Sequence, residues 1–114
     1  IEYYSLVLSE LDKNSATYAD ILYRRGGSFE RLGKYELSDK DLLQSLKIRP
    51  DDPYTLNYLA YGWLERGYKI NESLKMLNKA YKQKKNDPYI IDSVGWDIIW
   101  LEIMKKQKNI WEKQ

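Results

Sequence analysis

Cysteine and histidine are both absent from the 114 residues of this chain. Without thiolates or imidazoles, nucleophilic cysteine chemistry, histidine acid–base catalysis and the usual zinc sites are excluded. The absence of cysteine is compatible with the cytoplasm or the periplasm and does not choose between them. No apolar run approaches the roughly 20 residues that a membrane-spanning helix needs, and no signal peptide is visible. We therefore expect one soluble domain with no cofactor and no membrane span.

An excess of charge of one sign is also missing, since 19 Lys and Arg stand against 17 Asp and Glu. A nucleic-acid-binding domain carries a clustered basic face, and this composition does not indicate one. Carboxylate pairs such as Asp39 with Asp41, or Asp51 with Asp52, would need a buried pocket to separate their pKa values for catalysis. Because these pairs fall on a polar helix face and in a turn, we expect no enzyme activity.

Phenylalanine occurs once, whereas the chain has 11 Tyr and 4 Trp. Tyr and Trp combine a large apolar body with a polar group, so they suit binding surfaces as well as the seams between helices. We expect roughly half of them to fill seams only and the others to be available for binding.

Apolar residues recur at steps of three and four along the chain, which is the period of an α-helix. Asp52-Pro53 and Asp87-Pro88 each resemble a capping carboxylate followed by proline at the first helical position. Gly33 fits the end of a helix, where a positive φ is needed. The pattern predicts no strand and helices over 1–11, 16–32, 35–48, 53–66, 71–84 and 88–112, the last open to a break near Leu101.

One pattern of large and small residues occurs three times. The copies are Leu22-x-x-Arg25-Gly26-x-x-Phe29, Leu56-x-x-Leu59-Ala60-x-x-Trp63 and Ile91-x-x-Val94-Gly95-x-x-Ile98. The first two begin 34 residues apart and the last two 35, with the extra residue between Gly67 and Ser73. The small residue lets a second helix approach closely, and large residues beside it fill the remaining space. One such helix pair cannot bury its apolar face alone, so neighbouring pairs stack.

This pattern resembles the tetratricopeptide repeat, in which large-x-x-Leu-Gly-x-x-Tyr is followed by Ala-x-x-x-Phe and by Pro over 34 residues. The resemblance extends from Ile1 to about Leu101 and implies an all-α, right-handed solenoid of antiparallel helix pairs. Within a single domain 1–114 it implies complete repeats at 19–52 and 53–87. It further implies the second helix of a preceding repeat at 1–15, the first helix of a further repeat at 88–101, and an atypical helical tail at 102–114.

Several positions depart from the family pattern. Arg25 stands where the family usually has Leu, so we expect looser packing there. Asn71 is expected to cap the fifth helix. Because the sequence begins without Met, we expect a piece of a longer protein of bacterial type. The repeat positions expected to be buried are Leu22, Phe29, Leu42, Leu56, Leu59, Ala60, Trp63, Leu77, Ala80, Ile91, Val94, Gly95 and Ile98.

In the tetratricopeptide family the first helices of the repeats line a concave groove that holds an extended peptide. The matching positions here, expected to be partly exposed, are Tyr23, Tyr54, Asn57, Tyr58, Tyr61, Tyr89, Asp92 and Trp96. The Lys, Asn and Arg residues with which the family clamps a C-terminal carboxylate are absent. A Tyr-rich groove instead favours a peptide with apolar or proline residues. Alternatively, these tyrosines only cover the inner surface or pack on further repeats.

The tail after Trp96 does not continue the repeat pattern. Back-translation with a shifted reading frame gives a conventional second-helix sequence, so a frameshift is one explanation of the tail. Because the tail lacks Gly and Pro, it should extend the preceding helix. Its apolar stripe could fold back over the last repeat or pair with a second copy as a homodimer. The residues expected to associate are Trp100, Ile103, Met104, Ile110 and Trp111.

Overall fold

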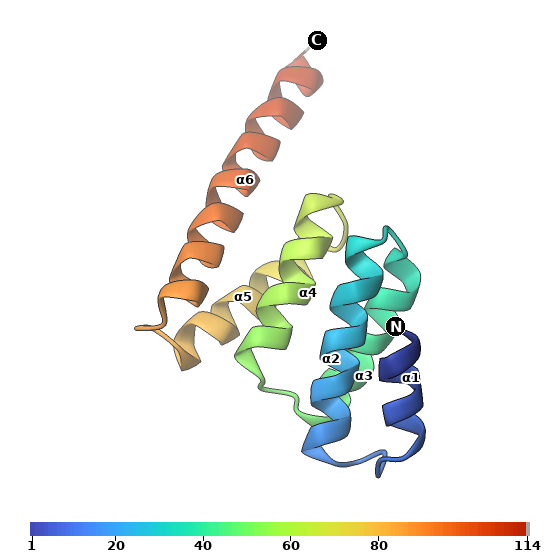
Figure 1. Cartoon of the computed structure of the whole chain (residues 1–114). Coiled ribbons are helices and arrows are strands. Elements are labelled where there is room, and N and C mark those ends of the chain that lie inside the picture. Colours follow the sequence, from blue (N-terminus) through green and yellow to red (C-terminus); the bar gives the residue numbers. More distant parts are fainter. Residues whose placement is uncertain (114) are drawn as a thin grey trace.

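The computed structural model describes residues 1–113, apart from the side chains of Ser93, Asp97, Trp100, Leu101, Met104, Lys105 and 107–113. The described residues form no strand. Their six helices are α1 (Glu2–Ser9), α2 (Ala16–Arg31), α3 (Tyr35–Ile48), α4 (Pro53–Glu65), α5 (Ile70–Gln83) and α6 (Pro88–Lys113). Figure 1 shows them as successive antiparallel neighbours, with the second half of α6 projecting from the body. The prediction of an all-α array of helix pairs is confirmed.

Local chemistry explains where the helices begin and end. The Ser15 hydroxyl accepts from the Tyr18 backbone N–H at 3.0 Å, and Asp52 and Asp87 cap α4 and α6 in the same manner. Gly33 follows the last turn of α2 with φ of 76°, which glycine adopts without steric cost.

The extra residue between the second and third copies is accommodated at Lys69, which has φ of 47°. Lys69 is the N-cap of α5, and Asn71 lies inside the helix, so the prediction that Asn71 caps it is wrong. The Lys69 ammonium lies 5.1 Å from the centre of the Trp63 ring and 5.3 Å from that of Tyr68. These cation–π contacts help to hold an unusual backbone conformation.

Small residues allow the paired helices to approach each other. A Cβ atom at Gly26 would lie 2.9 Å from Leu42 Cγ, so α2 and α3 meet too closely there for any side chain. Ala60 is fully buried in a cluster with Leu64 and Leu77, which joins α4 to α5. A second cluster, formed by Leu42, Leu59 and Trp63, joins the first helix pair to the second. The core therefore runs continuously along the array.

The expectation of loose packing at Arg25 is wrong. Its Nε and Nη2 atoms each donate to the Asp41 carboxylate at 2.7 Å, and a third bond reaches Ser5 in α1. Leu59 and Met76, which occupy the matching positions of the next copy, contribute to an apolar cluster instead. A paired charge thus replaces an apolar contact between α2 and α3.

Burial of the third copy is only partly as predicted. The expected core residues in the first two copies are buried, whereas Ile91 and Ile98 are 43% and 52% exposed and Val94 and Gly95 are half-buried. Helix α6 packs on α4 and α5, and among the described residues no second helix covers its other side. Ile90, which points to the core, is fully buried.

Helix α6 continues from Pro88 to Lys113. The helix break that the sequence left undecided near Leu101 does not occur. The second half of α6 contains neither glycine nor proline, so nothing in that sequence ends the helix.

No helix in the described part of the chain combines the length and apolar character required to cross a membrane. Among the same residues, no group of acidic side chains is placed to hold a metal ion.

Candidate functional site

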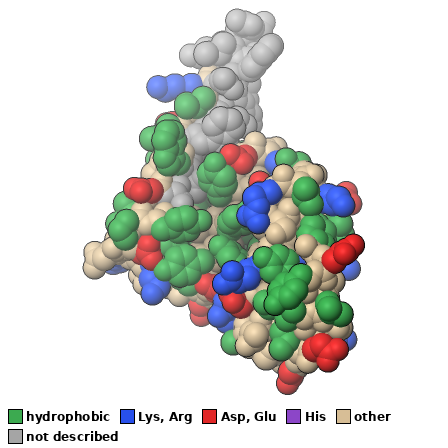
Figure 2. Space-filling view, viewed as in Figure 1, with side chains coloured by type: hydrophobic (Ala, Val, Ile, Leu, Met, Phe, Trp, Pro, Cys, Tyr) green, Lys and Arg blue, Asp and Glu red, His purple; other side chains and the backbone are tan. Residues whose placement is uncertain are grey.

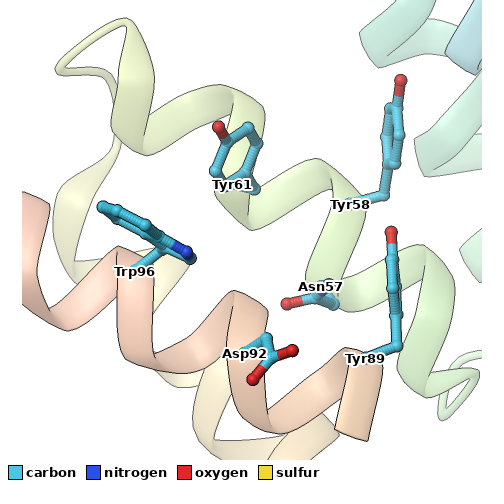
Figure 3. A pocket seen from close by; sticks show the side chains of 6 residues that line it. All are labelled: Asn57, Tyr58, Tyr61, Tyr89, Asp92 and Trp96. Carbon is cyan, nitrogen blue, oxygen red and sulfur yellow. The ribbon is translucent and has the colours of Figure 1, made fainter.

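A cavity of about 580 Å³ lies between α4 and α6. Its lining residues are spaced so that each helix presents one face to it. Helix α4 contributes Asn57, Tyr58 and Tyr61, and α6 contributes Tyr89, Asp92 and Trp96. Figure 3 shows these side chains facing a common space from the two helices. We call this cavity the aromatic groove.

Two of the eight expected groove residues support the lining without forming part of it. The Tyr23 ring packs edge-on against Tyr58, with ring centres 5.8 Å apart. The Tyr54 ring lies 6.2 Å from that of Tyr89. The side chain of Ser93, which follows Asp92 in the sequence, lies outside the described residues.

The Asp87-Pro88 pattern predicts only that Asp87 caps a helix, but Asp87 has a second role at the groove. Its Oδ1 atom accepts from the Tyr89 backbone N–H, while Oδ2 accepts from the Tyr54 hydroxyl. The Tyr54 hydrogen bond is the main reason that the pKa of Asp87 lies below its ordinary value. Asp87 thereby links the first turns of α4 and α6, a contact between residues 33 positions apart.

Tyr58 connects the aromatic groove to the first helix pair. Its hydroxyl donates to Glu30 Oε2 at 3.1 Å, and the Gly27 carbonyl oxygen lies 3.4 Å away. Burial, followed by the negative charge of Glu30, raises the pKa of Tyr58 to about 12. Both causes favour the neutral phenol. At neutral pH Tyr58 therefore lines the groove as an uncharged side chain that its hydrogen bonds hold in place.

This pKa predicts an alkaline loss of stability. Because the folded pKa is above the unfolded value near 10, the Tyr58 contribution is complete below pH 10 and is lost as the pH rises towards 12. The free energy of unfolding in urea should therefore decline more steeply across this range in the parent chain than in Tyr58→Phe. Phenolate absorbance should likewise contain one late-titrating group that Tyr58→Phe lacks. Identical slopes in the two proteins would contradict the assignment.

Asn57 differs from the expectation that all groove residues are partly exposed, because it is only 2% exposed. It sits between α4 and α6 at the inner end of the aromatic groove (Figure 3). Its Oδ1 atom has no hydrogen-bond partner among the described residues. A buried acceptor left unpaired costs free energy, and such groups call for a specific explanation.

The outer part of the aromatic groove is open and apolar. Tyr61, Tyr89 and Trp96 are exposed, Trp96 to 67%. Among the described residues that line the cavity, Asp92 is the one charged side chain. Figure 2 shows hydrophobic side chains gathered over the first turns of α6 and beside α4. Exposed aromatic surface of this kind is typical of sites that bind another molecule.

Few of the tail residues expected to self-associate have described side chains. Ile103 is exposed, but the side chains of Trp100, Met104, Ile110 and Trp111 lie outside the described residues. Ile98 and Ile99, one turn earlier on α6, are also exposed. Self-association through α6 remains a prediction.

The fold and the aromatic groove together define an α-helical repeat protein. Over 77 residues, 68% of this chain, it is 32% identical to the TPR repeat-containing protein PA4667 of Pseudomonas aeruginosa, and the match spans 13% of that protein's length. No family model and no solved structure matches. The chain belongs to the tetratricopeptide-repeat family. Proteins of this family are interaction modules for other proteins and are generally non-catalytic scaffolds.

Proposed function

We propose that the chain binds an extended peptide segment of another protein in the aromatic groove between α4 and α6. The observation that carries the proposal is the cavity between these two helices, whose lining leaves Tyr61, Tyr89 and Trp96 exposed. Contact of a ligand with these three aromatic side chains would remove their apolar surface from water, which favours binding.

The lining residues indicate the chemistry of the peptide. Tyr61 and Trp96 offer rigid aromatic faces that suit an apolar or proline side chain, because little conformational entropy is lost on contact. Asp92 and the faces of neighbouring rings favour a Lys or Arg nearby, through charge and cation–π attraction. A ligand carboxylate would be repelled by Asp92, in agreement with the absence of the carboxylate clamp. The proposed ligand is therefore an apolar or proline-containing segment that carries a basic residue.

Selection of peptides against the purified chain tests this proposal. A library of blocked 12-residue peptides should yield sequences that pair proline or apolar residues with Lys or Arg. Trp96→Ala should weaken the best of them by about tenfold or more, as removal of a central aromatic anchor typically does. Tyr3→Ala, which removes another well-exposed aromatic side chain, far along the array on α1, serves as the matched control and should bind normally.

Asn57→Leu isolates the buried acceptor. The substitution keeps a similar volume and removes the unpaired oxygen, so the fold should be retained or stabilised. Peptide affinity should stay within about threefold of the parent value, because the Asn57 side chain is buried beneath the aromatic surface. Isothermal titration calorimetry measures the affinity, and thermal unfolding measures the stability. Selected peptides that bind Trp96→Ala as tightly as the parent chain would place the site elsewhere.

A further inference from the structure

A second cavity, of about 520 Å³, lies between α5 and α6 and is mainly apolar. Its lining includes Leu74, Leu77 and Tyr81 of α5 and Ile91, Gly95 and Ile98 of α6. With 3.6 residues per turn, these α6 positions lie on the opposite side of the helix from Tyr89, Asp92 and Trp96. We call it the α5–α6 slot, and it is separate from the aromatic groove.

The internal repeat indicates what such a slot accommodates. Gly26, Ala60 and Gly95 occupy the same position in the three copies. At Gly26 the side chain of Leu42 in α3 is so close that a Cβ atom would lie 2.9 Å from it, and Ala60 is fully buried in a cluster with Leu77 of α5. A Cβ atom at Gly95, by contrast, would meet nothing within 4 Å among the described residues. Helix α6 thus has the small-residue contact site of a first helix, but no described second helix occupies it.

Positive charge at the edge of the slot indicates which side chains a bound helix would carry there. Asn78 lines the slot, and Lys75 and Lys82, three residues before and four after it, are exposed on the same side of α5. A helix lying in the slot would have this basic edge beside it, so acidic residues along its flank would be favoured.

We infer that the α5–α6 slot binds one amphipathic α-helix of a partner protein, seated on Gly95 as α3 is seated on Gly26. The partner helix places a leucine against Gly95 and a small residue one turn later, as Leu42 and Ser45 do in α3. It carries Asp or Glu on the flank that faces Lys75 and Lys82. Helix α3 itself supplies the leucine and the small residue, Leu42 and Ser45, both of which are buried in the first copy.

A synthetic peptide of residues 34–49, which spans α3, serves as the probe and carries Asp41→Met. The substitution is needed because Val94 stands where Arg25 pairs with Asp41 in the first copy. The peptide should bind the full chain saturably in fluorescence anisotropy, whereas the same peptide carrying Leu42→Glu should not bind. Gly95→Leu fills the contact site and should weaken binding by about tenfold or more. Gly62→Leu is the matched control, because a Cβ atom at this helical glycine also meets nothing within 4 Å among the described residues, and it should bind as the parent chain does.

Each alternative outcome is distinguishable. Absence of binding, or equal binding to the parent chain and Gly95→Leu, would overturn the inference. Loss of peptide binding in Trp96→Ala with retention in Gly95→Leu would assign the peptide to the aromatic groove instead. A dimer in sedimentation that Gly95→Leu converts to monomer would mean that a second copy fills the slot, and would overturn the assignment to a partner protein. Circular dichroism confirms that both glycine variants remain helical.

Discussion

Asp41→Ala is expected to lower the free energy of unfolding by about 3 kcal/mol, because it leaves a partly buried guanidinium without its partner. The Asp41 side chain is 3% exposed and that of Arg25 is 23% exposed. Two bonds of 2.7 Å join them, and the bond to Asp41 is the main cause that raises the pKa of Arg25. Arg25 also bonds Ser5, so loss of Asp41 should loosen α1, α2 and α3 together. Urea denaturation followed by circular dichroism measures the change.

The next copy provides the compensating variant. Leu59 and Met76 stand where Arg25 and Asp41 stand in the first copy. The double variant Arg25→Leu with Asp41→Met should therefore be within about 1 kcal/mol of the parent chain or more stable, since apolar replacement of a buried pair avoids the desolvation cost.

A second Arg–Asp pair serves as the control. Arg66 Nη2 lies 2.9 Å from Asp39 Oδ1, but both side chains are more than a fifth exposed. Asp39→Ala should cost no more than about 1 kcal/mol, because solvent screens such a pair and the released arginine can be hydrated. If Asp41→Ala cost no more than Asp39→Ala, the buried pair would not have the stabilising role described here.

The sequence was sufficient to predict the helices because their boundaries depend on neighbouring residues. Asp52-Pro53 and Asp87-Pro88 carry both the capping group and the helix start within two positions. The role of Arg25 was not predictable in the same manner, since its partner lies 16 residues away. An Arg–Asp pair is also only one of many residue pairs that can fill this contact between α2 and α3. Burial of Ile91 and Ile98 was overestimated because it requires a second helix that does not follow them among the described residues.

The positions of the candidate groove residues followed from the repeat register, because first-helix residues one turn apart face the same side. Sequence alone did not separate Tyr23 and Tyr54, which support their neighbours, from the residues that line the cavity. Nor did it reveal that Asn57 is buried with an unpaired oxygen. These distinctions depend on how far α4 and α6 are separated, and that spacing is set by packing across the whole array.

Ala60→Leu should cost on the order of 1–3 kcal/mol, because Ala60 is fully buried against α5 and no space exists for three further carbon atoms. The same change at the matching position of the third copy, Gly95→Leu, should be neutral or stabilising by up to about 1 kcal/mol. Leucine favours the helix over glycine there, and the site is open. Thermal and urea unfolding of both variants measure the contrast.

The opposite signs of these two substitutions would separate packing from intrinsic helix propensity. Propensity alone predicts a small effect at Ala60, since alanine and leucine are both good helix formers, and a gain of up to about 1 kcal/mol at Gly95. Packing predicts a large cost only where a second helix is present, as α5 is at Ala60. Comparable destabilisation by Ala60→Leu and Gly95→Leu would mean that a helix already occupies the α5–α6 slot in solution, whereas no cost at Ala60 would contradict close packing of α4 against α5.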